Sequence, residues 1–224
     1  MDRSTAVDRV CELLDTLETD PVPVPVRSVW VLGDLALGLD PVERIDLYLR
    51  KDLLFASGES DSDAADRYEA EYGIAGVGTT ISAEWAEAHP NQIRTNANGY
   101  AAPEQCLAAH LIGDEEPIHL EVCNARFEHN VTQRLQGGLA RDALTEVLDP
   151  RAVCVWQDET RSDDAITRLR EGEFVFPPLE EALEMIGMES EDAERTAEAL
   201  HSWRSEPAGA SVRGDVLSRA ENSY

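Results

Sequence analysis

The sequence predicts a mixed α/β (α+β) protein, in which a sheet flanked by helices is followed by a C-terminal helical region. Two observations lead to this prediction. Short segments such as PIHLEVC at 117–123 alternate apolar and polar residues, which is typical of strands with one buried face. Longer segments place apolar residues three and four positions apart, which is typical of helices that cover a core. With 224 residues, 42% of them hydrophobic, the chain can bury such a core.

The expected elements follow from these periodicities and from local start and stop signals. The expected strands are residues 26–32, 43–49, 117–123 and 152–156. The expected helices are residues 5–17, 82–88, 103–111, 125–148, 162–170, 178–186 and 190–204. Ser4 and Asn124 are the expected N-caps, and Gly137-Gly138 is expected to interrupt the long helix. Residues 57–67 are expected to form a solvated loop or the lead-in to a helix.

Three regions are expected along the chain. Residues 1–150 contain the first three strands and should form a sheet domain. Residues 151–205 should add a short strand and helices that pack on that domain. Residues 206–224 are polar and contain proline, glycine and serine, so we expect a flexible tail.

The charge is extreme, with 45 acidic residues against 19 basic ones and a net charge of −26. Only one of the basic residues, Lys51, is a lysine. This composition is typical of a protein that works in molar salt, where screening over about 3 Å removes most self-repulsion. Without a block of lysines or arginines, nucleic-acid binding is disfavoured.

The chain shows no signal for export or for a membrane. Its first 20 residues contain no long apolar run, so we expect no signal peptide. No segment approaches the roughly 18 apolar residues that a membrane span needs. The scattered cysteines are then expected to be reduced thiols in a cytoplasmic protein.

Three residues on the expected strands form a candidate site. Gly33 directly follows the first strand, and Asp46 lies on the polar face of the second. Glu121 lies on the polar face of the third strand. Divalent ions need several oxygen ligands on one face, and alternate positions of a strand share a face.

This arrangement resembles the nucleotidyltransferase superfamily of the polymerase-beta type, over residues 29–49 and 117–123. In that superfamily a strand ending in glycine and serine binds nucleotide phosphates, and carboxylates on later strands hold two metal ions. The resemblance implies that Gly33 binds phosphate and that Asp46 and Glu121 bind metal and act in catalysis. An active enzyme would then use Mg²⁺ or Mn²⁺ with a nucleoside triphosphate.

Two residues depart from the pattern of that superfamily. Arg44 stands in the place of the first carboxylate, and a guanidinium has no lone pair for a metal. We expect it to pair with Asp46, with which it shares a face. Asp34 stands where a serine normally meets a phosphate, and it would repel a triphosphate unless a metal lay between them. The site is therefore expected to be catalytically weakened, or rearranged so that Asp34 joins Asp46 and Glu121 as a catalytic carboxylate.

An amide-rich loop over residues 91–100 offers a second set of ligand-binding groups. We expect Arg94 to assist Gly33 and Arg44 in binding a nucleotide, since arginines bind phosphate and amides can read a base or a sugar. Two further arginines, Arg126 and Arg134, could line the same cleft. The alternative is a turn-rich connector that its own asparagines stabilise.

Two Cys/His pairs have helical and strand spacing, respectively. Cys106 and His110 share a helix face, whereas His119 and Cys123 lie about 13 Å apart along a strand, too far to bind one zinc together. The alternative that we favour is a core cysteine and a hydrogen-bonded histidine on each element. Whether Cys106 and His110 bind a metal stays open.

The C-terminal helices over residues 178–205 read as a helical hairpin. It would cap the sheet, or it would offer a surface for a protein partner. The stretches GDLALGLDPVERIDLYL, NANGYAAPE and PIHLEVCNA resemble a family of uncharacterised haloarchaeal proteins. Three functions therefore remain open: a weakened nucleotidyltransferase-like domain that binds a nucleotide or a protein partner, an active enzyme with a rearranged site, and a non-enzymatic interaction protein.

Overall fold

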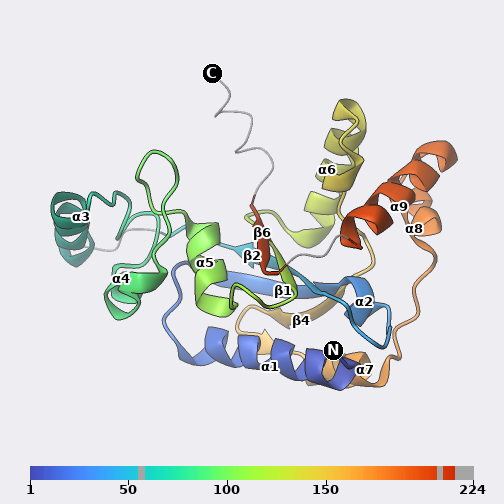
Figure 1. Cartoon of the computed structure of the whole chain (residues 1–224), viewed down its shortest axis with the longest axis horizontal. Helices are drawn as coiled ribbons and strands as arrows, with labels where there is room; N and C mark the ends of the chain where they lie inside the picture. Colours follow the sequence, from blue (N-terminus) through green and yellow to red (C-terminus); the bar gives the residue numbers. More distant parts are fainter. Residues whose placement is uncertain (55–58, 206–208, 215–224) are drawn as a thin grey trace.

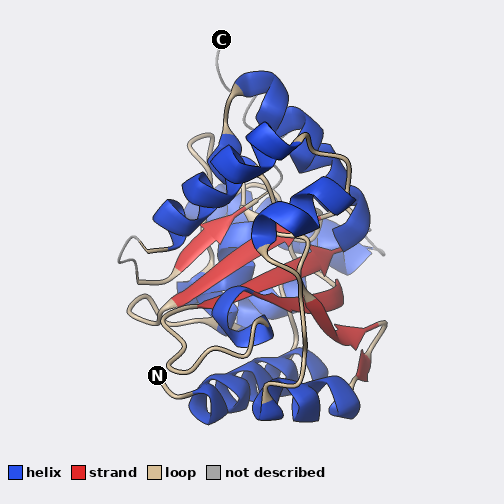
Figure 2. Ribbon diagram, turned by 90° about the vertical axis from the view of Figure 1, so that its right-hand side faces the viewer, coloured by secondary structure: helices blue, strands red, loops and turns tan. Residues whose placement is uncertain are grey.

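The computed structural model describes residues 1–54, 59–205 and 209–214. Within them, helices cover both faces of a six-stranded mixed sheet, as Figures 1 and 2 show. The strands are β1 (Val26–Leu32), β2 (Ile45–Lys51), β3 (Ile118–Cys123), β4 (Val153–Gln157), β5 (Thr160–Arg161) and β6 (Ser211–Arg213). The helices are α1 (Arg3–Thr19), α2 (Gly33–Ala36), α3 (Glu59–Tyr72), α4 (Ala83–Ala88), α5 (Pro103–Leu111), α6 (Phe127–Arg141), α7 (Asp163–Glu171), α8 (Leu179–Met185) and α9 (Ser190–Arg204), with 3-10 turns η1 (Pro90–Gln92) and η2 (Leu144–Glu146). The predicted fold class is confirmed.

The strand order in the sheet is β5-β4-β1-β2-β3-β6. β1 runs antiparallel to β2 and β4, whereas β2, β3 and β6 run parallel to one another. This pairing places Asp46 between Leu32, the last residue of β1, and His119 of β3. Tyr48 in turn lies beside Glu121. The polar residues predicted for the second and third strands therefore share one face of the sheet.

The other face of the sheet is apolar and packs against α1 and α7, which lie below it in Figure 1. The strands contribute the buried side chains of Val29, Val31, Ile45, Leu47, Leu49, Ile118, Leu120 and Val122. Helix α1 begins two residues earlier than predicted, because Asp2, and not Ser4, accepts the hydrogen bond from the Thr5 N–H that defines the N-cap. This continuous cluster is the main source of hydrophobic stabilisation.

The polar face is covered by α6 and by the hairpin of α8 and α9. The hairpin turns its apolar side inward, and its buried residues are Leu179, Leu183, Ala193, Ala197 and Leu200. They pack against Leu135 and Val147, so the hairpin covers one side of α6 and the loop after it. Helices α3 and α4, the loops that follow them and Cys106 of α5 form a smaller hydrophobic cluster, with α3 and α4 at the left in Figure 1.

The Gly-Gly pair at 137–138 does not interrupt α6, which continues to Arg141. The reason is packing: a Cβ on Gly138 would lie 2.8 Å from Cγ2 of Val147. The glycine lets the following turn approach the helix closely. The helix begins at Phe127 with Arg126 as its N-cap, and not with the predicted Asn124.

Two expectations about loops and tail are corrected. Residues 59–72 form α3, whereas residues 57–67 were expected to be a loop or a helix lead-in, and residues 55–58 lie outside the described part. Residues 211–213 belong to the expected tail but form β6, which pairs with β3. The rest of that expectation, at 206–208 and 215–224, lies outside the described residues.

The structure also shows the state of the thiols and the surroundings of the single lysine. The four cysteines are free. Lys51 is buried, and its Nζ contacts Oδ1 of Asn124 at 2.6 Å and Oε1 of Glu104 at 3.1 Å. In the described part of the chain, no helix combines the length and the apolar character that crossing a bilayer requires.

We predict that Gly33→Ala destabilises the protein more than Gly73→Ala. Both glycines have left-handed φ angles, +63° and +66°, so each substitution carries a conformational penalty of about 1–2 kcal/mol. An added Cβ at Gly33 would also overlap Oδ2 of Asp46, whereas nothing lies within 4 Å of a Cβ at Gly73. Urea unfolding in molar KCl measures both free energies. Equal losses would show that Gly33 does not abut Asp46.

Candidate functional site

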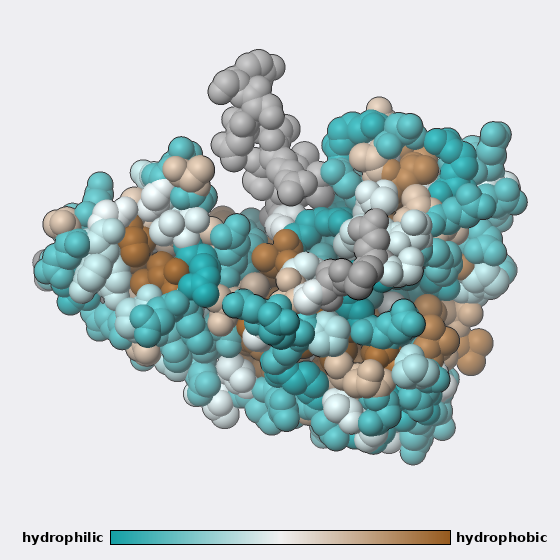
Figure 3. Space-filling view, viewed as in Figure 1, coloured by the Kyte–Doolittle hydropathy of each residue, from teal (hydrophilic) through white to brown (hydrophobic). Residues whose placement is uncertain are grey.

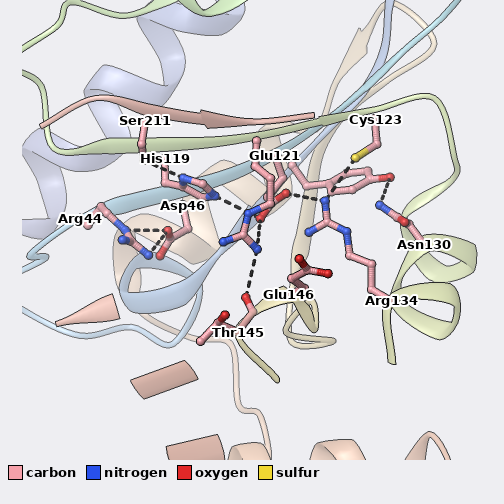
Figure 4. A network of polar contacts seen from close by, with 12 residues as sticks. Arg44, Asp46, His119, Glu121, Cys123, Asn130, Arg134, Thr145, Glu146 and Ser211 are labelled. Atoms are coloured by element: carbon pink, nitrogen blue, oxygen red, sulfur yellow. Dashed lines mark hydrogen bonds and ion pairs between the residues drawn. The ribbon is translucent and has the colours of Figure 1, made fainter. Parts of the chain in front are cut away.

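The polar face of the sheet carries two neighbouring features. The first is a carboxylate network, which we define as Asp46, Glu121, Arg44, His119 and Arg134 (Figure 4). The second is an arginine cavity at the other ends of the same strands, and it is named for Arg27, Arg50 and Arg126 in its lining. Each could serve a different function.

In the carboxylate network, Asp46 is held by Arg44, as the sequence predicts. Oδ1 of Asp46 accepts hydrogen bonds from Nε of Arg44 at 2.8 Å, and Nη2 lies at the same distance. Both side chains are buried. Burial raises the pKa of Asp46, while the charges of Arg44, Arg204 and His119 act in the opposite direction. Arg44 therefore already occupies one oxygen of this carboxylate.

Glu121 is bound from two sides. Its Oε2 accepts a hydrogen bond from Nη2 of Arg134 at 2.7 Å, and its Oε1 lies 3.1 Å from Nε2 of His119. The other ring nitrogen of His119 lies 2.7 Å from Oγ of Ser211 on β6. Burial alone would raise the pKa of Glu121, but the His119 hydrogen bond and the Arg134 charge lower it to about 2. Glu121 is therefore ionised and fully engaged at neutral pH.

The C-terminal end of α9 closes the carboxylate network. The Trp203 ring lies between two guanidinium groups, at 4.5 Å from Arg44 and 4.6 Å from Arg213, and meets the His119 ring edge-on at 5.0 Å. Next to it, Arg204 donates to Asp149 at 2.8 Å. The space left beneath these residues has a volume of about 20 Å³, which is room for about one water molecule.

The remaining residues of the predicted site contribute less to this face. Gly33 abuts Asp46, so the structure brings these two together. Asp34 uses Oδ2 to accept a hydrogen bond from the Glu43 N–H at 3.0 Å. Across the described residues, no group of three or more His, Cys, Asp or Glu side chains is placed to hold a metal ion. The catalytic and metal-binding roles of Asp34, Asp46 and Glu121 stay predictions.

Arg94 and the Cys106/His110 pair lie elsewhere. The guanidinium of Arg94 donates to the carbonyl of Asn91 at 2.9 Å within its own loop. Sγ of Cys106 contacts the backbone of Arg94, and burial raises the pKa of this thiol. Nδ1 of His110 lies 3.0 Å from Oε1 of Gln92. These contacts agree with a hydrogen-bonded core histidine and a core cysteine.

The arginine cavity has a volume of about 380 Å³. It is lined by Arg27, Ser28, Trp30, Arg50, Arg126, Phe127, Glu128, Gln157 and Asp158. Its floor comes from the start of β1 and the end of β2, and its wall comes from the first residues of α6. Trp30 and Phe127 stack, with ring centroids 4.7 Å apart and planes inclined by 17°.

The arginines of this cavity differ in what they bind. Arg27 is paired with Asp52 at 2.9 Å. Arg50, which is half-buried, and Arg126, which is exposed, make no hydrogen bond or ion pair with any residue that the structure describes. The Nε atom of Arg50 is itself buried and without a partner.

The sequence predicts Arg126 as a cleft residue but does not predict Arg50 or Trp30 at this site. A signal for Arg50 was present, because it continues the face of Arg44, Asp46 and Tyr48 at alternate positions of β2. Trp30 gave no comparable signal, since an aromatic residue in a strand is usually part of a core.

Comparison with known families places residues 2–217 in a match to a family described as a family of unknown function, DUF7095. The matched range contains both the carboxylate network and the arginine cavity. No curated protein and no solved structure matches the chain.

We predict that Glu121→Gln lowers the free energy of unfolding by about 3 kcal/mol near neutral pH. The folded pKa of about 2 lies below the value of 4.5 for an unperturbed glutamate. The stability that the ionised group contributes is therefore present above pH 4.5 and is lost as the pH falls towards 2. Unfolding of both proteins between pH 7 and pH 3 should show the difference shrink with acidification.

The matched control is Glu194→Gln on the exposed side of α9. Glu194 makes no hydrogen bond or ion pair within the described residues, so its replacement should leave stability almost unchanged at every pH. A pH-independent loss for Glu121→Gln would contradict the role of the ionised carboxylate.

Proposed function

Because this chain belongs to the family of unknown function DUF7095, we propose its function from its own geometry. It is a binding protein for a small anionic ligand, and the ligand lies in the arginine cavity. The carboxylate network is a structural feature of a nucleotidyltransferase-like domain that has lost metal-dependent transfer.

The observation that carries this proposal is the pair of unpartnered arginines. The chain has a net charge of −26, so carboxylates are abundant around every cation. Apart from Arg50 and Arg126, every arginine in the described part of the chain makes a hydrogen bond or an ion pair. Nε of Arg50 is buried without an acceptor among the described residues, which costs free energy that a bound anion would recover, whereas Arg126 is exposed and open to a ligand.

The position of the cavity supports the same conclusion. Arg50 lies at the carboxyl end of β2 and Arg126 follows the carboxyl end of the parallel strand β3. Ligands of open α/β sheets commonly bind outside the carboxyl ends of their strands. The first turn of α6 begins at Phe127 without a side-chain cap, so its N–H groups add a positive partial charge beside Arg126.

The carboxylate network supports a structural role better than a catalytic one. Arg44 already neutralises Asp46, and Arg134 already neutralises Glu121. A divalent ion would have to displace both guanidinium groups and would meet two more cations, Arg204 and Arg213. Active transfer through Asp34, Asp46 and Glu121 remains the alternative, and it requires α9 to move.

A protein partner on residues 178–205 is a second alternative. The apolar face of this hairpin is buried, but Met185 and Ile186 at the end of α8 are 74% and 38% exposed. We propose a halophilic, haloarchaeal cytoplasm as the setting, which the acidic composition and the four free thiols support.

We predict that Arg50→Gln and Arg126→Gln each weaken the binding of inorganic pyrophosphate about tenfold, because each removes a charge-assisted hydrogen bond. Isothermal titration calorimetry at the lowest KCl concentration that keeps the protein folded measures this loss. The matched control is Arg141→Gln at the other end of α6, where the arginine pairs with Glu146 outside the cavity. Unchanged binding in both cavity variants would overturn the proposed function.

We also predict that lowering KCl from molar concentrations to about 0.1 M destabilises the protein, because the screening length rises from about 3 Å to about 10 Å. Thermal unfolding across this range measures the effect. Glu121→Gln should show the same salt dependence as the wild type, since a buried ion pair is screened little. Stability that does not change with KCl would contradict adaptation to brine.

A further inference from the structure

We propose that the ligand of the arginine cavity joins a flat heteroaromatic ring to a phosphate, as a nucleoside monophosphate does. This inference rests on the proposed function and names the class of its ligand. Three observations support it: the aromatic rings beside Arg50 and Arg126, the size of the cavity and the balance of charges in its lining.

The aromatic part of the cavity is the Trp30–Phe127 stack, both members of which line it. The indole N–H of Trp30 already contacts Oγ of Ser28 at 3.3 Å, so what Trp30 offers a ligand is ring surface. Phe127 is fixed from behind, because it meets the Tyr48 ring edge-on at 5.3 Å. Because Phe127 is buried and covers one face of Trp30, the surface on which a base can stack is the remaining face of the half-buried Trp30.

The solvent that the acidic composition indicates explains why a ring is needed. In molar KCl, screening and competing chloride weaken the attraction between a guanidinium and a phosphate. Two arginines alone would then bind many small anions with little preference. Stacking of an uncharged ring on Trp30 does not depend on an ion pair and is not screened in this way. A ring on Trp30 therefore adds to the weakened affinity that Arg50 and Arg126 supply in brine.

The charge balance of the cavity limits the number of phosphates. Arg27, Arg50 and Arg126 face two carboxylates, Glu128 and Asp158, and Arg27 is already paired with Asp52 outside the cavity lining. A triphosphate would bring these carboxylates close to several more negative charges. A single phosphate suits two free arginines, and the carboxylates can accept hydrogen bonds from sugar hydroxyls.

The volume agrees with a ligand of this size. About 380 Å³ lies near the lower end of the range of roughly 300–1,000 Å³ for small-molecule pockets. The cavity is also separate from the place where the polymerase-beta resemblance would put a nucleotide. Ser28 pairs with Arg50, whereas Leu32, next to Gly33, pairs with Asp46. Four residues of strand, about 13 Å, separate the two places.

The test is calorimetry in molar KCl with the four ribonucleoside monophosphates, ribose 5-phosphate and adenosine. We expect at least one nucleotide to bind about tenfold more tightly than ribose 5-phosphate, with an aromatic contribution of the size known for base stacking. Trp30→Leu should remove most of that advantage and leave ribose 5-phosphate unchanged. Arg50→Gln should weaken the nucleotide and ribose 5-phosphate but leave adenosine unchanged.

The matched control is Trp203→Phe, which changes a tryptophan that packs on the carboxylate network and should not affect binding. Thermal unfolding shows whether each variant is folded. If Trp30→Leu fails to fold, saturation-transfer NMR on the wild type decides, because base protons should receive more saturation than ribose protons.

Equal affinity of ribose 5-phosphate and every nucleotide, or stronger saturation of the ribose, would overturn this inference and leave the proposed function standing. If none of the compounds binds, or if Arg50→Gln changes no affinity, the proposed function itself fails. The two failures are therefore distinguishable.

Discussion

The ion pair between Glu121 and Arg134 connects the sheet to the helix that builds one wall of the cavity. Its two partners come from β3 and α6, and both are buried, so each needs the other to offset the loss of water. Surface charges of this acidic chain are screened in brine, but a pair at this depth is not. The pair therefore fixes how α6 lies on the sheet, and with it the positions of Arg126 and Phe127 seven or more residues earlier.

Much of the sheet could be predicted from the sequence because alternation along a strand is a local property. Alternation correctly placed Arg44 beside Asp46 and set Ile45 on the other face. The partner of Glu121 could not be found this way, since Arg134 reaches it from a helix. Strand β6 was missed for the same reason: Ser211–Arg213 are too short to show a period and gain their partners only from the edge of β3. The arginine cavity likewise depends on which strands are neighbours.

The arginines on the polar face of the sheet differ in their partners between the carboxylate network and the arginine cavity. In the carboxylate network each arginine meets a carboxylate or an aromatic ring, and Trp203 leaves little space beneath it. In the cavity, Arg50 at the end of β2 and Arg126 at the N-cap of α6 make no hydrogen bond or ion pair within the described residues. The paired arginines therefore hold the sheet and its covering helices together, whereas the cavity is the part of this face with space for a ligand.

The burial of Lys51 has a consequence for the chemistry of the whole surface. It is the only lysine, and its amine is enclosed by Asn124 and Glu104, while the N-terminal amine contacts the carbonyl of Val42 at 2.9 Å. The folded protein therefore presents no exposed lysine amine to reagents such as succinimidyl esters or aldehydes. Labelling by these reagents would report the opening of the β2 end of the sheet and not its surface. Lysine-directed conjugation or acetylation has no accessible target on the native fold.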